Sequence, residues 1–597
     1  MSSIGERNMH YSKSLGHLCL FFSLILALIL CKLYLVEAQD LCVFNSSLDD
    51  RLFVELAKNI AEGRWLGVYD NRTLIKGPVY PLWIALIYKS GLPLLFSEHL
   101  LYIIACLFFI SAIGPMVKRA THLLIVFCFL LFNPMTYTDW NMNMAFRAGI
   151  NPALTLLVIS ITLKILIKKG SSVTQRFLWS ITLGFFLSAF WLTREESIWI
   201  LPFFAGILTF DGFQIFKNRH FFSVKLEAAL WFTPFLVLFL AIMTVSMVNK
   251  IYYDNFTSVE IKTQPFRSAY GALLRVRQKP FKLAVPVSKE TRQEIYAVSD
   301  AFLQLKPFLE GQIGKKFIGD LYKLKQLYEK GLVNERVSRM IHRLLEQDKS
   351  GIWRQIWQQS NPDNWDILGI SFIWVFRDAI AAAGYHDDWA TARNFYTRLA
   401  AQINVACEEG HLDCLSERST LVPPWRNDYM LPLFKIFLYE CYATAAFSNF
   451  DPWSRHCSDD PVALALFREV TGETPVRQAA GNIPQRNFRI RILERIGWVY
   501  QQIFPGMAGV MVLLYLFSTF KNMKNRCFCP FWCIATSIGM SLLMLMLGLS
   551  YIHITSVSTI ETRYLAPAYP LVFIFCIFSW LGFRGYPWPS HHVIRSV

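Results

Sequence analysis

Long apolar runs alternate with short polar stretches along most of the chain. Most of these runs are about 15–23 residues long, and an apolar helix of roughly 20 residues can cross the hydrocarbon layer of a bilayer. The pattern predicts about ten transmembrane helices, at residues 15–36, 98–115, 121–135, 149–167, 177–193, 196–211, 228–249, 495–518, 529–550 and 565–583. Residues 80–95 are also apolar, but Lys89, Gly91 and Pro93 interrupt them. We therefore expect a re-entrant or interfacial helix there rather than a full span.

Positive charge between the predicted spans indicates their orientation. Lys and Arg concentrate in the short cytoplasmic loops of multi-pass proteins. If the N-terminus is cytoplasmic, every predicted cytoplasmic loop is basic; these loops carry Lys118, Arg119, Lys168, Lys169, Arg176, Lys217, Arg219, Lys521, Lys524 and Arg526. Both termini are thus expected in the cytoplasm, with the chain in a plasma or inner membrane, or in the endoplasmic reticulum membrane of a eukaryote.

The first apolar run has a rival interpretation as a cleavable signal peptide. Residues 36–38 resemble a small-x-small cleavage site, but the run is long for the hydrophobic region of a signal peptide. An uncleaved first helix is the favoured interpretation. In either case the segment that follows lies outside the cytoplasm.

The polar region 251–492 predicts a large, mostly helical extracytoplasmic domain between two membrane modules. The first module, residues 1–250, contains an outer loop at 37–97; the second, residues 493–597, ends in a short cytoplasmic tail. The expected fold class is an all-α polytopic membrane protein. Within the polar region Cys407 and Cys414 are close in sequence. They can pair in an oxidising compartment, although spacing alone does not establish the geometry of a disulfide.

Composition supports a membrane protein and argues against a nucleic-acid partner. The chain is 54% hydrophobic and only 17% charged, against roughly 25% charged residues in soluble domains. Its net charge of +16 arises mainly outside residues 251–492, in the short loops. No basic face interleaved with aromatic residues accompanies it, as a nucleic-acid surface requires.

Charged residues gather at the predicted outer ends of the spans. They come from four separate loops: Asp49, Asp50 and Lys76; Asp139 and Arg147; Arg194, Glu195 and Glu196; and His553, Glu561, Arg563 and Tyr564. Charged groups at membrane depth are costly and usually line a cavity or a path. The combination predicts a site for an anionic, membrane-borne ligand.

Each member of this set also has a structural interpretation. Asp49 and Asp50 begin a predicted amphipathic helix, where a carboxylate can cap the helix or favour its positive end. The charged run 194–196 can simply end a span, and Lys76 and Arg147 can reach toward lipid headgroups. The residues alone leave open whether Asp49 and Asp50 form a helix cap or a reaction centre.

The order of several motifs resembles the GT-C superfamily of integral-membrane glycosyltransferases. The nearest similarity is to protein mannosyltransferases and lipid A aminoarabinose transferases. It rests on Asp49-Asp50, Gly63, Trp65, the run 76–81 (KGPVYP), Phe132-Asn133-Pro134, and Arg563-Tyr564 followed by Pro567 and Pro570. The resemblance covers about 1–250 and 495–583, and residues 251–492 lie outside it.

The resemblance implies transfer of a sugar from a polyprenyl-phosphate carrier on the extracytoplasmic side. The implied catalytic base is Asp49, with Asp50 as its helper; because the second position is often Glu in the family, the two roles can be exchanged. The implied phosphate-binding residues are Lys76, Arg147, Arg194, Arg563 and Tyr564. Some relatives hold a divalent cation, for which Asp139 and Glu195 are the candidates.

The acceptor, which can be a lipid, a glycan or a protein, the sugar and the stereochemistry stay open. Two other classes of function compete with this interpretation. One is a transporter of lipid-linked oligosaccharide or polysaccharide, which should show internal symmetry and broken helices at the membrane midplane; the sequence shows neither clearly. The other is a non-catalytic envelope assembly protein.

Overall fold

The chain folds almost entirely into α-helices. The computed structural model describes residues 2–43, 49–117, 119–138, 142–167, 172–218, 221–282, 284–333, 365–453, 460–475, 484–525, 529–556 and 562–585, with Ser458 and a few isolated residues between 338 and 358. Within these residues no β-strand forms, and Val276 and Cys414 make one isolated bridge. The predicted all-α fold is confirmed for this part of the chain.

Eight helical segments of the described chain are long and apolar enough to cross a membrane. They are α1 (Ser2–Val36), α4 (Leu94–Ile113), α5 (Ala120–Leu131) with η1 (Pro134–Tyr137), α7 (Val173–Thr193), η2 (Ser197–Ile200) with α8 (Leu201–Asn218), α9 (Phe221–Tyr253), α21 (Pro484–Lys524) and α22 (Pro530–Thr555). Two shorter apolar helices, α6 (Asn151–Ile167) and α24 (Ala568–Arg584), occupy two further predicted positions. The chain is a multi-pass membrane protein.

The count of ten spans and their orientation stay predictions. Of the basic residues on which the orientation rests, Lys118, Lys168, Lys169, Arg219 and Arg526 lie outside the described residues. We therefore name the ends of the helix bundle by what they carry. The end that packs beside the large polar region is called the domain end.

α6 is the central helix of the bundle. All of its residues are buried, and it packs between α4, α7 and α24. A helix that is covered on every side needs apolar residues all round, which explains why its sequence shows no polar face.

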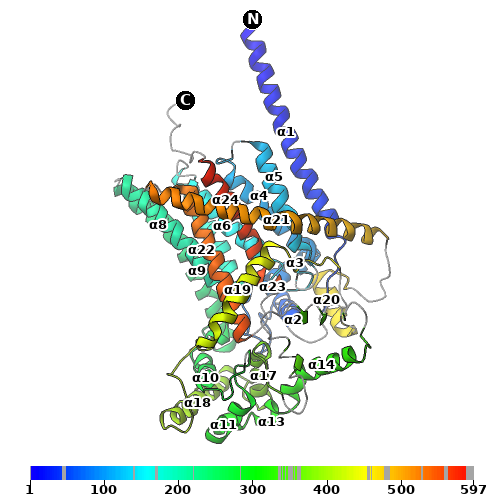
Figure 1. Ribbon diagram of the computed structural model, residues 1–597, viewed down its shortest axis with the longest axis vertical. Helices are drawn as coiled ribbons and strands as arrows, with labels where there is room; N and C mark the ends of the chain where they lie inside the picture. Colours follow the sequence, from blue (N-terminus) through cyan, green and yellow to red (C-terminus); the bar gives the residue numbers. More distant parts are fainter. Residues whose placement is uncertain are drawn as a thin grey trace.

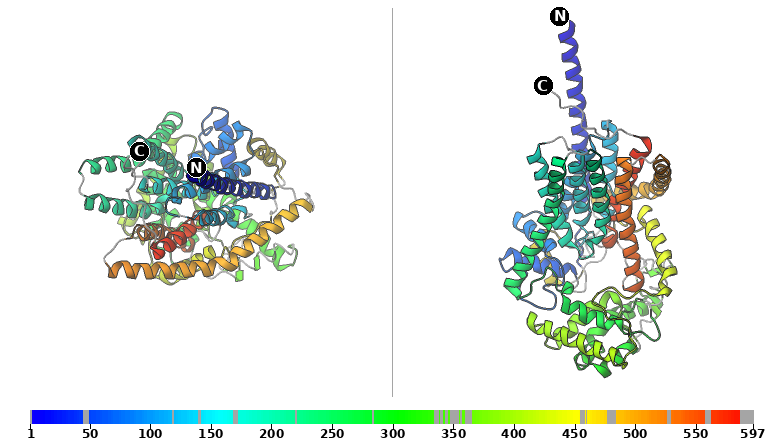
Figure 2. Two further views of the ribbon diagram at one scale, coloured as in Figure 1. Left: turned by 90° about the horizontal axis from the view of Figure 1, so that it is seen from above. Right: turned by 90° about the vertical axis from the view of Figure 1, so that its left-hand side faces the viewer.

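α21 departs from the direction of its neighbours. Figures 1 and 2 show it running across the bundle rather than along α22 and α24. Its 41 residues correspond to about 62 Å, roughly twice the thickness of the hydrocarbon layer. α21 packs mainly on α24, across the direction of that helix.

The segment after α1 forms two short helices rather than a span. α2 (Asp49–Ala61) is amphipathic and buries Leu52, Phe53 and Leu56, and it packs on α3 (Val79–Ser90). α3 ends at Gly91, whose left-handed backbone (φ 70°) lets its N–H bond to the Tyr88 carbonyl. α4 then begins at Leu94. With 12 residues, α3 is too short to cross a bilayer.

A second hydrophobic core lies at the domain end of the bundle (Figure 1). Its helices are α10 (Gln264–Arg275), α11 (Lys289–Val298), α12 (Asp300–Leu303), α13 (Lys306–Leu309), α14 (Gln312–Glu329), α17 (Gly369–Ala382) and α18 (Trp389–Glu408). Phe266, Phe376 and Tyr396 are buried at its centre, with their rings in contact. The buried residues of this core all come from the polar region 251–492, and Tyr69 packs against them.

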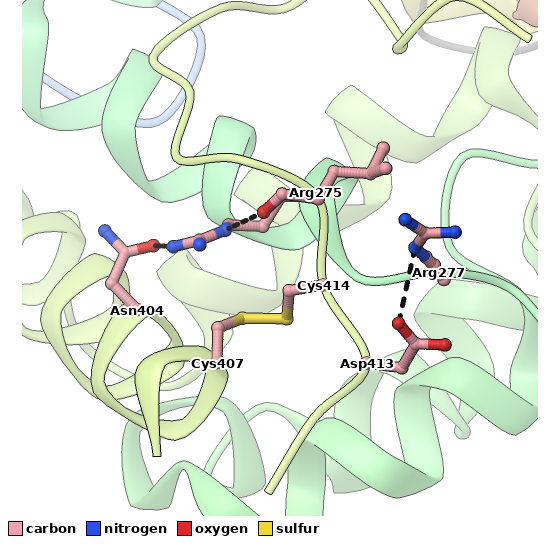
Figure 3. The surroundings of a disulfide bond; sticks show 7 residues. Arg275, Arg277, Asn404, Cys407, Asp413 and Cys414 are labelled. Atoms are coloured by element: carbon pink, nitrogen blue, oxygen red, sulfur yellow. Dashed lines mark hydrogen bonds and ion pairs between the residues drawn. A yellow bond between two sulfur atoms is a disulfide. The ribbon is translucent and has the colours of Figure 1, made fainter. Parts of the chain in front are cut away.

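A disulfide bond between Cys407 and Cys414 closes the end of α18 (Figure 3). Beside it the Arg275 guanidinium donates to Asn404 Oδ1 (2.8 Å) and to the Leu415 carbonyl (3.0 Å). These bonds attach the segment after α18 to the end of α10. The disulfide therefore reinforces one edge of the second core.

Two helices of the polar region pack on the bundle instead of the second core. α19 (Met430–Ala445) lies along α22, and α20 (Pro461–Thr471) covers α2 and α3. Phe447, Phe467 and Val470 are buried in the same core as the membrane helices. The polar region therefore contributes to two cores.

Candidate functional site at the domain end of the bundle

The link between α7 and α8 places three successive charged residues at the domain end. α7 ends at Thr193, and Arg194 is extended (φ −134°, ψ 138°). The Ser197 hydroxyl donates to the carbonyls of Phe190 (3.2 Å) and Arg194 (3.0 Å). These bonds set the turn, so that the side chains of residues 194–196 leave the axis of the span.

Arg147 and Glu195 form a largely buried ion pair. Arg147 Nη1 lies 2.7 Å from Glu195 Oε2 and 3.1 Å from the Thr193 carbonyl, and the Gly77 N–H points to Glu195 Oε1 at 3.4 Å. Burial opposes ionisation of Glu195, but the charges of Arg147 and Lys76 outweigh it and lower its pKa to about 2. Glu195 is therefore held as a carboxylate at neutral pH.

Asp49 and Lys76 form a second ion pair beside the first. Lys76 Nζ lies 3.4 Å from Asp49 Oδ2, and both side chains are partly accessible, at 17% and 15%. Lys76 Nζ also lies 5.4 Å from the centre of the Trp374 ring, on α17 of the second core. Burial lowers the pKa of Arg147, yet the carboxylates of Glu195, Glu196 and Asp49 raise it overall. Asp49 thus belongs to the same electrostatic cluster as Arg147.

Arg194 connects this cluster to the loop before α24. It pairs with Glu196, and its Nη1 donates to the Arg563 carbonyl at 2.5 Å. Its guanidinium lies over the Tyr564 ring at 5.4 Å, and the Arg563 guanidinium lies over the same ring at 4.9 Å. Residues more than 360 positions apart are therefore in contact.

We call this set the open cluster: Asp49, Lys76, Arg147, Arg194, Glu195, Glu196, Arg563 and Tyr564. The structure brings together all the predicted phosphate-binding residues and one of the two predicted carboxylates. They come from the segment after α1, the segment before α6, the α7–α8 link and the loop before α24. The Arg147–Glu195 pair and the contacts of Arg194 with Arg563 and Tyr564 join different segments, whereas the Asp49–Lys76 and Arg194–Glu196 pairs each lie within one segment.

Asp50 lies apart from the open cluster. Its side chain is fully buried and shares a face of α2 with Phe53, whose ring centre lies 5.1 Å from that of Tyr80. Burial, the charge of Glu98 and, to a smaller extent, the charge of Asp50 raise the pKa of Tyr80. Asp49 and Asp50 are the first two residues of α2, and adjacent residues on a helix point about 100° apart. This geometry separates their environments and leaves Asp49 as the accessible carboxylate.

Other predicted members lie elsewhere or outside the described residues. His553 is buried on α22. Asp139 and Glu561 lie outside the described residues. In the part of the chain that the structure describes, no group of three or more His, Cys, Asp and Glu side chains is arranged to hold a metal ion. Glu195, the described metal candidate, is already bonded to Arg147, which does not fit a metal ligand.

A small cleft opens beside the open cluster. Its lining residues come from the end of α7, from α9 and from the segment after α9: Trp191, Leu192, Arg194, Glu195, Ile242, Ser258, Val259 and Lys262. Trp191, Leu192 and Ile242 are apolar and lie within candidate spans, whereas Lys262 is exposed. The cleft therefore joins an apolar wall on the membrane helices to charged groups.

A second group of charged residues was not predicted from the sequence. We call it the sealed cluster: Tyr69, Glu260, Arg377, His386 and Tyr396. Arg377 Nη1 lies 2.5 Å from Glu260 Oε1, and Tyr69 donates to Glu260 Oε2 at 2.8 Å. Burial raises the pKa of Glu260, but Arg377 and His386 lower it well below its usual range. Its members are spread over more than 300 residues without a periodic pattern, so no local signal marks them.

The sealed cluster holds the segment that carries Lys76 against the second core. Arg377 Nε donates to the Asn71 carbonyl (2.7 Å), and Asn71 Nδ2 donates to Asp378 Oδ1 (2.5 Å). Arg72 pairs with Asp378 at 3.4 Å. Since Trp374, Arg377 and Asp378 all lie on α17, one helix of the second core positions the segment that leads into the open cluster.

Comparisons with protein-family models, with curated proteins and with solved structures found no match to this chain. The residues and contacts described above therefore carry the functional information for this chain.

Proposed function

We propose that the protein is a membrane glycosyltransferase that moves a sugar from a polyprenyl-phosphate carrier to an acceptor on the extracytoplasmic side. The observation that supports this proposal is the open cluster. It combines Asp49, a partly accessible carboxylate that is not bonded to a guanidinium in the described part of the chain, with four cationic side chains from four separate segments. The proposal further places the domain end of the bundle on the side away from the cytoplasm.

Asp49 is the proposed general base. The acceptor hydroxyl or amine attacks the anomeric carbon, the bond between that carbon and the phosphate oxygen breaks, and the acceptor proton passes to the Asp49 carboxylate. Polyprenyl phosphate leaves with the electron pair of the broken bond. Asp49 is preferred to Asp50 because Asp50 is fully buried and an acceptor has no access to it.

The cations of the open cluster balance the charge of the leaving phosphate. Arg147 and Arg194 are each bonded to a carboxylate and to a backbone carbonyl. These bonds hold the guanidinium groups in place before a donor binds, and charged groups that are oriented in advance stabilise a developing negative charge most effectively. The planar guanidinium also suits phosphate geometry.

The cleft beside Trp191 and Lys262 supports a donor that is anchored in the membrane. A polyprenyl chain against Leu192 and Ile242 would bring its phosphate to the charged end of the cleft. We include no metal ion in the reaction, because Glu195 is engaged by Arg147.

The test is transfer of a radiolabelled sugar from polyprenyl phosphate to acceptors in envelope fractions. Asp49→Asn should lower the transfer rate about 10²–10⁴-fold, the usual contribution of a general base, and leave donor binding largely unchanged. Asp254→Asn is the matched control, since Asp254 is exposed at the end of α9 with a positive φ (56°) that asparagine adopts readily.

Two results would contradict the proposal. If Asp49→Asn and Asp50→Asn both keep full transfer activity, the assignment of the base is wrong. If the purified protein instead moves the intact lipid-linked sugar across proteoliposome membranes without transferring it, the protein is a transporter.

A further inference from the structure

One face of α19 is apolar and uncovered. At least half of the surface is exposed for each of five apolar side chains on this face. They are Met430, Leu431, Phe434, Leu438 and Tyr442. Because four of them recur every four residues, they form a single stripe along the helix. We call this set the α19 stripe.

The opposite face of α19 is fixed against the bundle. Ile436 is buried in one cluster with Ile554 of α22, and Glu440 accepts a hydrogen bond from Ser550 of α22 at 2.9 Å. Figures 1 and 2 both show α19 lying alongside α22. The helix is therefore held at one depth relative to a candidate span.

The end of α19 reaches well inside the apolar length of the bundle. Phe447, two residues beyond the helix, lies 6.1 Å from the Phe573 ring and 5.1 Å from the Phe504 ring. α24 begins at Ala568, so Phe573 lies roughly 7–8 Å along its axis. The first residue of α19 lies about 20 Å from Phe447 along the helix axis, toward the domain end. It is therefore at the level of the lipid headgroups or beyond.

The backbone polar groups in the turn after α19 form hydrogen bonds with side chains of the bundle. Non-helical backbone at membrane depth needs protein partners for its polar groups. Gln501 Nε2 donates to the Phe447 carbonyl (3.1 Å), Thr138 Oγ1 donates to the Asn449 carbonyl (3.2 Å), and the Asp451 N–H donates to Thr138 Oγ1 (2.9 Å). Side chains of the bundle thus replace water around this turn.

The positions of the charged residues on α19 are consistent with a helix that enters the lipid layer. Its ionisable groups with a formal charge are Lys435 and Glu440. Glu440 is fully buried against α22, and Lys435 is exposed in the first half of the helix, where a lysine can extend its ammonium toward headgroups. Neither charge lies on the stripe between Leu438 and Tyr442.

We propose that α19 is a re-entrant helix embedded in the leaflet at the domain end, with the α19 stripe in contact with lipid acyl chains. The sequence places residues 251–492 outside the membrane. This proposal instead returns residues 434–450 to the lipid layer, where they line the bundle beside α22. The lipid-facing surface continues on α22, which exposes Met540, Leu543 and Leu547.

The test uses a photoreactive benzoylphenylalanine in place of Phe434 or Tyr442, both aromatic already. The full chain is reconstituted in vesicles of phosphatidylethanolamine and phosphatidylglycerol, irradiated and analysed by mass spectrometry. Both positions should form phospholipid adducts, with attachment at the acyl chains for Tyr442. Val405, which is 49% exposed on α18 of the second core, is the matched control and should form none.

The proposal is overturned if Phe434 and Tyr442 give no more lipid adduct than Val405. It is also overturned if their main adduct is a second copy of the chain or another polypeptide, because the α19 stripe would then be a protein interface. An intact disulfide between Cys407 and Cys414 in each labelled protein shows that the region has folded.

Discussion

The open cluster and the sealed cluster use the same kinds of charged groups at the same end of the bundle, yet their surroundings differ. In the open cluster the side chains of Asp49 and Lys76 are partly accessible. In the sealed cluster Glu260 and Arg377 have no exposed surface. A sealed pair cannot exchange its partner for a ligand, whereas an accessible pair can. The comparison indicates that access, rather than charge alone, separates a candidate reaction centre from a structural cluster.

The two clusters are also connected. Tyr69 belongs to the sealed cluster, the Asn71 carbonyl accepts a hydrogen bond from Arg377 of α17, and Lys76, a few residues later, contacts Asp49. The sealed cluster therefore fixes one end of a short segment whose other end enters the open cluster. If this division of roles is correct, changes to the sealed cluster should alter stability, and changes to the open cluster should alter transfer.

The largest effect on stability is expected for Arg377→Ala. It leaves the Glu260 carboxylate buried without its main partner, and removing one member of a buried ion pair typically costs about 3–5 kcal/mol. Thermal unfolding of the detergent-solubilised protein should show the loss. Arg393→Ala, at an exposed position of α18, should stay within about 0.5 kcal/mol. Equal stability of the two variants would remove the distinction between the clusters.

A smaller loss of stability is expected for Cys407→Ser with Cys414→Ser. The disulfide closes a short loop, and the loop-entropy relation gives about 2–3 kcal/mol for a loop of this size. The change weakens the second core without touching either cluster. Unfolding should therefore shift while donor binding by the folded protein is retained. Loss of binding in the folded double variant would show that the open cluster depends on this edge of the second core.

Arg147→Lys should affect transfer more than stability. Lysine keeps the positive charge beside Glu195 but loses the planar fork that suits a phosphate. We expect the transfer rate to fall about tenfold, which corresponds to about 1.4 kcal/mol of transition-state stabilisation. Lys58→Arg, in the accessible pair with Glu469, is the control and should have no measurable effect. An unchanged rate for Arg147→Lys would place the donor phosphate elsewhere.

The smallest effect concerns pH and His386. Burial lowers the pKa of this imidazole below its ordinary value of 6.5, although Glu260 partly opposes the shift. The unfolded chain therefore binds more protons near pH 6.5 than the folded chain. Stability from this group is present above pH 6.5 and is lost as the pH falls below it. His386→Gln should flatten the decline in melting temperature between pH 7.5 and 5.5; an unchanged slope would mean that another group causes it.

Local sequence signals predicted much of the architecture correctly. Apolar runs correspond to helices at each predicted span position, because helix formation and membrane transfer depend on residues close together in the chain. The interruption at Gly91 and Pro93 falls between α3 and α4, although the predicted short helix ran to residue 95 and α4 already begins at Leu94. Residues that the motifs marked, such as Lys76, Arg147 and Arg194, meet in one cluster because the predicted spans end at the same level.

Other features required contacts between distant segments. The sealed cluster combines Tyr69, Glu260 and Arg377, none of which belongs to a motif. The different environments of Asp49 and Asp50 follow from how α2 packs against α3, not from their adjacent positions in the sequence. The place of α19 on the bundle follows from its contacts with α22 and α24.

By itself, the sequence determined that this chain is a helical, multi-pass membrane protein with charged residues at the ends of its spans. Hydropathy and helical periodicity are properties of neighbouring residues, so they can be recognised from the sequence alone. The tertiary structure decided which carboxylate remains accessible, which charges pair and which apolar face stays uncovered. These properties depend on burial by residues tens to hundreds of positions away, and burial sets both the cost of a charge and the partner that can offset it.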